Sequence, residues 1–176
     1  MDHALEKELE YIEGLSKRGL HEDAFGLCQK LLDAYPNFYK IYEVRSSIFR
    51  RIGDFERAIE DIDQVLRLAP STAAPYFRKG RYLMLLERYR DAAVEFTNAI
   101  KFDNGYFGDT LLFYRAEALL RVGSYEKCLK DCRGMRSNYS ESSFFGHRTR
   151  TRTEIENDAL AGLERNKKGR NKKGRS

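Results

Sequence analysis

Three cysteines and three histidines are the side chains of this 176-residue chain that could bind a metal ion or act as nucleophiles. Cys128 and Cys132 lie four residues apart, Cys28 is remote from both, and the histidines are scattered at positions 3, 21 and 147. A structural zinc site needs ligands at spacings such as C-x2-C and H-x3-H, and neither spacing occurs. All three cysteines fall at apolar positions of helical patterns. We therefore predict buried thiols that pack in a core, with no metal and no cofactor.

Carboxylates and glycine turns are the other features that could carry chemistry. Glu60, Asp61 and Asp63 are close in sequence, but acid-base catalysis needs a pocket that shifts pKa values, and their pattern predicts a solvated helix face. The turns "GDFER" and "GSYEK" lack the glycine-rich cradle and the Lys-Ser/Thr ending of a phosphate-binding loop. No set of side chains meets the requirements of a reacting site, so we predict that the protein is not an enzyme.

The net charge of +5 comes from 32 Lys and Arg against 27 Asp and Glu. Residues 147–176 hold ten of these cations and four of these acids, so the rest of the chain is close to neutral. The N-terminal residues are charged and contain no apolar run of the signal-peptide kind, and no stretch is long enough to span a membrane. Together with cysteines inside helical patterns, these features predict a cytoplasmic protein, with the nucleus as an alternative.

A period of 34 residues organises the chain that must position any site. Pro36, Pro70 and Asn104 each close an apolar helical run at this step, and alanine recurs at the same interval, at Ala24, Ala58 and Ala92. Each unit has two helical patterns separated by a glycine turn, and no β alternation intervenes. We predict helices over about 3–18, 21–34, 39–52, 55–68, 73–86, 89–102, 109–122 and 125–138. Gly80 and Ala58 are predicted to allow close helix packing.

The unit resembles the tetratricopeptide repeat (TPR) family, whose signature combines a large and a small residue, a glycine-aromatic turn, an alanine and a closing proline. "IYEVRSSIFRRIGDFERAIEDIDQVLRLAP" and "PYFRKGRYLMLLERYRDAAVEFTNAIKFDN" match it well, and the flanking segments match more weakly, as terminal repeats do. The resemblance covers about residues 4 to 140. It implies an all-α fold, a right-handed α-solenoid of antiparallel helix pairs over 1–140, with units of about 5–38, 39–72, 73–106 and 109–142.

The resemblance also implies a protein-protein interaction adaptor or scaffold, because the first helices of TPR pairs line a concave groove that usually holds a peptide segment. When the groove positions of the family are transferred to this chain, glutamates occupy the first half of the groove. Arginines and two phenylalanines occupy the second half. The predicted partner-binding residues are Arg50, Phe77, Arg78, Arg81, Phe113 and Arg121. The guanidinium group of arginine forms paired hydrogen bonds with carboxylates, and aromatic rings provide apolar contact area. We therefore predict that the groove binds an acidic segment with an apolar anchor. The alternative is that the arginines are solvated and the phenylalanines pack between repeats.

One TPR subclass binds the C-terminal carboxylate of heat-shock chaperones through lysine, asparagine and arginine side chains. At four of the carboxylate-binding positions of that subclass, this chain has Leu9, Glu13, Val44 and Ala74 instead. Only Arg78 matches the residue type of the subclass. A co-chaperone-like role would therefore lack a complete carboxylate clamp, because most of the cationic and amide donors are missing.

The residues after 140 depart from the repeat. A polar linker is predicted over 141–152, with Phe144 and Phe145 as an apolar plug, followed by a capping helix over 153–165 that starts with capping-box spacing at Thr153 and Glu156. "NKKGR" then occurs twice, which predicts a basic disordered tail over 166–176. Its cations are Lys167, Lys168, Arg170, Lys172, Lys173 and Arg175.

Three roles of this tail stay open: a solubilising end, a contact with nucleic acid or another acidic surface, and a nuclear-import-like address. The alternative function is accordingly that of a nucleic-acid- or ribonucleoprotein-associated protein, whose binding would be nonspecific and would fall steeply with salt.

Overall fold

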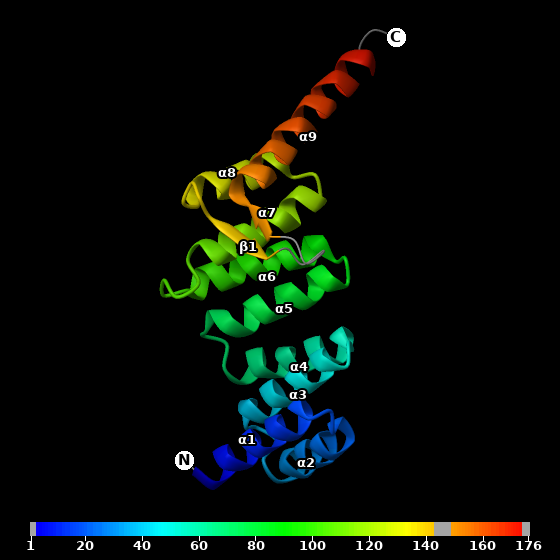
Figure 1. The fold of residues 1–176 in the computed structure, drawn as a ribbon, viewed down its shortest axis with the longest axis vertical. Helices are drawn as coiled ribbons and strands as arrows, with labels where there is room; N and C mark the ends of the chain where they lie inside the picture. Colours follow the sequence, from blue (N-terminus) through cyan, green and yellow to red (C-terminus); the bar gives the residue numbers. More distant parts are fainter. Residues whose placement is uncertain (1–2, 143–148, 174–176) are drawn as a thin grey trace. The chain divides into compact units, whose positions relative to one another are not determined.

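The computed structural model describes residues 3–142 and 149–173, and it is mainly helical (Figure 1). The described residues form nine α-helices and one two-stranded antiparallel ribbon. The elements in chain order are α1 (His3–Lys17), α2 (His21–Ala34), α3 (Tyr39–Arg51), α4 (Phe55–Leu68), α5 (Ala73–Leu85), α6 (Tyr89–Phe102), α7 (Asp109–Arg121), α8 (Tyr125–Gly134), β1 (Ser140–Ser142), β2 (Thr149–Thr151) and α9 (Arg152–Lys173). None of these helices has the length and apolarity of a membrane span.

The first eight helices begin where the 34-residue pattern predicts, and seven of them end within one residue of the predicted bound. The exception is α8, which stops at Gly134 because Met135 adopts an extended conformation with ψ of 155°. Turns between paired helices use Gly19, Gly53 and Gly123 at φ of 82°, 79° and 75°. Glycine adopts this left-handed region without a Cβ clash, which explains its recurrence at the turns.

The chain divides into two compact units, residues 1–78 and 79–176. In the first unit, consecutive helices from α1 to α4 pack on one another, and α1 also packs on α3. Ile12, Ile41, Ile48 and Ile62 are buried at the centre of this packing, with Ala58 at a close contact. Burial of this apolar surface holds the helix pairs together.

In the second unit, α6 packs on α7, α7 on α8, and α8 on α9. Gly80 lies against the buried ring of Phe96, because a Cβ built on Gly80 would come within 2.6 Å of the ring atom Cε1. The predicted role of Gly80 as a close-packing residue is therefore confirmed. Gly162 in α9 faces the ring of Tyr125 in the same way, which brings α9 close to α8.

A cation on the first helix of a pair meets an acid on the second helix in three successive repeats. Arg45 binds Asp61 through two hydrogen bonds of 2.7 and 2.9 Å, Arg115 binds Asp131 through two of 2.6 and 2.8 Å, and Lys79 lies 3.0 Å from Glu95. Asp61 is only 2% exposed, so its assignment to a solvated helix face is wrong. Burial raises the pKa of the Asp61 carboxyl, and the Arg45 guanidinium opposes that rise.

The C-terminal helix α9 differs from the predicted capping helix at both ends. Its capping box is formed by Thr151 and Glu154, whose carboxylate accepts from the Thr151 amide at 2.8 Å, so the box lies two residues before the predicted pair. Its apolar face agrees with the prediction, because Ile155 and Ala159 are fully buried. The helix then continues to Lys173, through residues where the sequence predicts a disordered tail.

The free-energy cost of a helix lies mainly in forming its first turn, so an existing helix such as α9 can extend into the basic segment. Each glycine in the extension destabilises the helix by about 1 kcal/mol relative to alanine. At the two described ends of the predicted polar linker, β1 and β2 pair as an antiparallel ribbon, with Glu141 opposite Arg150. The predicted plug of Phe144 and Phe145, and the tail residue Arg175, lie outside the described residues.

Candidate functional site

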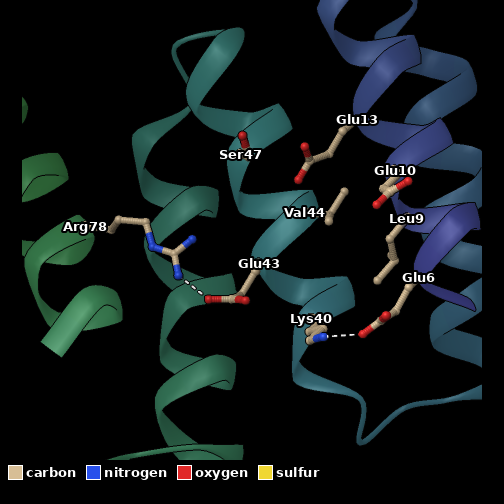
Figure 2. Close-up of a pocket in the computed structure, with 9 residues that line it drawn as sticks. All are labelled: Glu6, Leu9, Glu10, Glu13, Lys40, Glu43, Val44, Ser47 and Arg78. Atoms are coloured by element: carbon tan, nitrogen blue, oxygen red, sulfur yellow. Dashed lines mark hydrogen bonds and ion pairs between the residues drawn. The ribbon is translucent and has the colours of Figure 1, made fainter. Parts of the chain in front are cut away.

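A groove of about 450 Å³ opens between α1 and α3 in the unit of residues 1–78, and Figure 2 shows the side chains that line it. We call it the α1–α3 groove. Its lining residues are Glu6, Leu9, Glu10, Glu13, Lys40, Glu43, Val44, Ser47 and Arg78.

The two facing helices present their side chains at the same spacing. Glu6, Leu9, Glu10 and Glu13 lie at i, i+3, i+4 and i+7 of α1, and α3 repeats this spacing from Lys40 through Glu43 and Val44 to Ser47. Positions so spaced share one helix face. The buried side chains of Leu9 and Val44 form an apolar floor between two polar rims. The groove is therefore a product of the helical repeat, which brings the same face of two successive first helices together.

Both cations of the groove are paired with acids that line it. Lys40 donates to Glu6 at 2.6 Å, and Arg78 donates to Glu43. The hydrogen bond and charge of Lys40 lower the pKa of Glu6, although the pair is exposed and therefore screened by water. The Nε atom of Arg78 is buried and has no hydrogen-bond partner in the described part of the chain.

The remaining carboxylates of the groove are not neutralised in this way. Glu13 lies 4.0 Å from Lys17, a distance at the limit of an ion pair, and both side chains are largely exposed. Glu10 makes no hydrogen bond or ion pair with any residue in 3–142 or 149–173. Four glutamates against one lysine and one arginine leave the groove with a formal charge of −2. Its electrostatic character is acidic.

The structure brings one of the six predicted partner-binding residues, Arg78, to this groove. Arg50 is exposed at the C-terminal end of α3 and Phe77 is half-buried in α5, and neither lines the groove. The other three lie in the unit of residues 79–176. There Arg81 lies over the ring of Tyr114 and Arg121 over the ring of Tyr89, and both guanidinium groups are about 6 Å from the ring centres.

Phe113 does not present a surface to a ligand. Its ring is 0% exposed and meets Tyr114 edge-on at a centroid distance of 5.6 Å. This is the packing role that the sequence analysis gives as the alternative for the phenylalanines. Its neighbour Glu117 is also buried, where Arg150 binds it at 3.1 Å.

Sequence reasoning missed the two ion pairs of the α1–α3 groove, although the sequence contains a signal for them. Glu6 and Lys40 are 34 residues apart, and Glu43 and Arg78 are 35 apart. Opposite charges that lie 34 or 35 residues apart on successive first helices are close enough to meet across the groove, because each repeat stacks on the next. A search for opposite charges at this separation finds both pairs, but only the packing of the helices decides that they form.

The three cysteines are fully buried and unpaired, which confirms their predicted packing role. Burial raises the pKa of the Cys28 thiol to about 12, so this thiol stays protonated and unreactive. Within residues 3–142 and 149–173, no group of three or more His, Cys, Asp or Glu side chains is arranged to hold a metal ion.

Comparison with known proteins matches part of the chain to a repeat family. A family model described as tetratricopeptide repeat matches residues 45–107. A protein SGT1 homolog of Oryza sativa subsp. japonica is 26% identical over 98 residues, an alignment that covers 53% of this chain and 27% of the rice protein. The chain thus spans about a quarter of that relative.

Solved structures show the same fold at low sequence identity. The crystal structure of MamA protein superposes with a TM-score of 0.65 at 17% identity, over 72% of this chain and 68% of MamA. YrrB, a TPR protein with an unusual peptide-binding site, superposes with a TM-score of 0.63 at 16% identity, over 72% of this chain and 64% of YrrB. The likeness extends the repeat fold well beyond the 45–107 match.

Proposed function

We propose that this tetratricopeptide repeat protein is an adaptor that holds a segment of a partner protein in the α1–α3 groove. The repeat family and the shared fold support a role in protein-protein interaction, which TPR proteins typically perform as scaffolds without catalysis. YrrB, of the same fold, has a peptide-binding site. In this chain, the observation that carries the proposal is a groove with an apolar floor and a surplus of carboxylates among its lining residues.

The charge of the groove favours a segment that carries lysine or arginine. The sequence alone favours an acidic segment, because it places arginine in the groove. However, Arg78 is already bound to Glu43, whereas Glu10 is unpaired among the described residues. An acidic segment would have to displace Glu43, and a cationic segment would meet a surplus of carboxylates. Each charge-assisted hydrogen bond contributes about 1.5–3 kcal/mol, so one such contact changes the dissociation constant about tenfold or more.

A bound segment would use the groove in two ways. An apolar side chain would cover the floor of Leu9 and Val44, and a cation would bind Glu10 and Glu13 on the α1 rim. The groove thereby selects both the charge and the apolar content of its ligand.

Fluorescence anisotropy with blocked, labelled peptides tests this assignment. The probes are a cationic peptide of alternating leucine and lysine and an acidic peptide of alternating leucine and glutamate. We expect the wild-type protein to bind the cationic probe, and Glu10→Lys to weaken that binding about tenfold through the reversed charge. Glu8→Lys is the matched control, since Glu8 is exposed on the same helix but does not line the groove.

Equal losses in Glu8→Lys and Glu10→Lys would show nonspecific attraction and refute the groove as the site. Tighter binding of the acidic probe, lost on Arg78→Glu, would instead support the acidic segment that the sequence predicts. The nucleic-acid alternative depends on the tail cations, and the side chains of four of them, Arg170, Lys172, Lys173 and Arg175, lie outside the described part. That alternative and the cytoplasmic location stay predictions.

A further inference from the structure

A second groove, of about 610 Å³, lies within the unit of residues 79–176 and is formed by α6, α7 and α8 together with the turn before α8. We call it the α6–α8 groove; these helices are the green to yellow segments of Figure 1. It shares no residue with the α1–α3 groove, and its chemistry is different. Whereas the first groove is acidic, the second combines apolar side chains with cations.

The floor of the α6–α8 groove is apolar. Ala93 and Val94 come from α6, Leu119 comes from α7, and Val122 follows directly after α7. Val94 is 58% exposed, although valine is usually buried in folded proteins. The exposed valine and the three half-buried apolar residues give the groove an apolar surface that a partner side chain can cover.

The polar groups at the bottom of this groove already bind one another. Arg115 binds Asp131 through two hydrogen bonds and donates to Thr97 Oγ1 at 3.2 Å, while Thr97 donates to the carbonyl of Ala93 at 2.8 Å. This closed network holds α6, α7 and α8 in register. It leaves neither the Arg115 charge nor the Asp131 charge in need of a ligand.

The cations on the rim of the α6–α8 groove, unlike Arg115, are not paired with an acid among the described residues. Arg90 on α6 and Lys127 and Lys130 on α8 are exposed and line the groove. Across residues 3–142 and 149–173, none of the three has a hydrogen bond, ion pair or ring contact. The rim therefore carries three positive charges without internal compensation, above an apolar floor.

We propose that the α6–α8 groove is a second docking site, for an acidic segment of a partner protein that carries one branched apolar side chain. The apolar side chain covers Val94 and Leu119, and the carboxylates bind Lys127 and Lys130, with Arg90 on the facing helix. Charge complementarity specifies the sign of the ligand, and desolvation of the apolar side chain adds affinity that charge alone cannot supply.

The apolar floor favours a peptide over a nucleic acid. Single-stranded nucleic acid is held by aromatic rings on which bases stack, and the described residues that line this groove include no aromatic side chain. The adaptor would then have two docking sites of opposite charge, one in each unit. This inference does not depend on the α1–α3 groove, because either site can bind without the other.

Anisotropy titrations test the inference with two labelled, blocked peptides and one RNA. The first peptide has leucine at the centre of six alternating aspartates and glutamates, the second has alanine in its place, and the RNA is an oligouridylate of similar length. We expect the leucine peptide to bind at least fivefold more tightly than the alanine peptide and the RNA. Lys130→Ala should weaken the leucine peptide about tenfold, and Val94→Asp should abolish its advantage over the alanine peptide.

Arg133→Ala is the matched control, because Arg133 is exposed on α8 and does not line the groove. The affinity of this variant for the leucine peptide should stay within about twofold of the wild-type value. An equal loss in Arg133→Ala, or equal binding of leucine and alanine peptides, would overturn the proposal in favour of general charge attraction. Tighter binding of the RNA would overturn it in favour of nucleic acid. Dimerisation of the protein that is lost in Lys130→Ala would assign the groove to a second copy instead. Glu10→Lys should leave binding of the leucine peptide intact, which separates this test from that of the α1–α3 groove.

Discussion

Replacing Arg150 with methionine should destabilise the protein more than any exposed charge substitution, because it removes the cation that faces a buried carboxylate. Arg150 on β2 donates to Glu117 of α7 at 3.1 Å and to Asp158 of α9 at 2.5 Å. Glu117 is 1% exposed, and its second carboxylate oxygen, Oε2, already lacks a partner among the described residues. Loss of Arg150 would leave this buried carboxylate without its hydrogen-bonded cation, and only the charge of Arg121 would still oppose its desolvation.

The expected cost of Arg150→Met is about 3–5 kcal/mol, the usual cost of breaking a buried ion pair from one side. This is a large share of the roughly 5–15 kcal/mol that holds a native domain folded. The lost contact to Asp158 adds less than about 1 kcal/mol, since that carboxylate is 61% exposed and water screens the pair. In the double variant Arg150→Met with Glu117→Met, most of the stability should return, because apolar side chains of similar volume replace both charges.

The pH dependence supplies an independent check. Burial raises the pKa of Glu117, and Arg150 partly opposes that rise, so the pKa should rise further in Arg150→Met. An acid whose folded pKa exceeds its unfolded value binds more protons when folded, and the free energy of unfolding then falls as pH rises between the two values. The cost of Arg150→Met relative to wild type should therefore be smaller at about pH 5 than at about pH 8.

Urea unfolding followed by circular dichroism measures these differences, with exposed Arg133→Met as the control. A cost of less than about 1 kcal/mol for Arg150→Met would refute the reasoning, and so would a double variant less stable than the single one. A cost independent of pH would show that Glu117 does not carry the effect.

Two further predictions concern the packing of the repeats. Gly80→Ala should destabilise the protein by about 1–3 kcal/mol in urea unfolding, because the new methyl group overpacks the Phe96 ring. Adding Phe96→Leu to this variant should recover part of the lost stability. If Gly80→Ala is instead more stable than the wild type, the gain in helix propensity outweighs the clash. The buried thiols of Cys28, Cys128 and Cys132 should react with Ellman's reagent only after unfolding in urea, and rapid reaction of the native protein would contradict their burial.

Periodic features of the sequence predict periodic features of the fold. The 34-residue step predicts where the eight paired helices begin, because apolar spacing and turn residues act locally and each repeat uses them in the same way. The same step predicts the close contact at Gly80 and the burial of the cysteines. The resemblance to the TPR family implies a groove lined by first helices, and the residues that line the α1–α3 groove come from α1 and α3, with Arg78 of α5.

Features that depend on one contact between distant residues escape this reasoning. The burial of Asp61 follows from its pairing with Arg45, and the paired state of Arg78 follows from Glu43 one repeat earlier. Neither residue has a local pattern that distinguishes it from a solvated charge. The continuation of α9 through the basic segment is of the same kind, since composition alone predicts disorder there.

The sequence by itself therefore determined the repeat, its helices and the face that each helix turns to its neighbours, since these depend on spacing within about one helix turn. Only the tertiary structure decided which charges are neutralised and which remain available to a ligand. The reason is that an ion pair needs two side chains at hydrogen-bond distance, and packing between helices sets that distance. The charge of both grooves, and with it the chemistry of the proposed partners, is decided at that level.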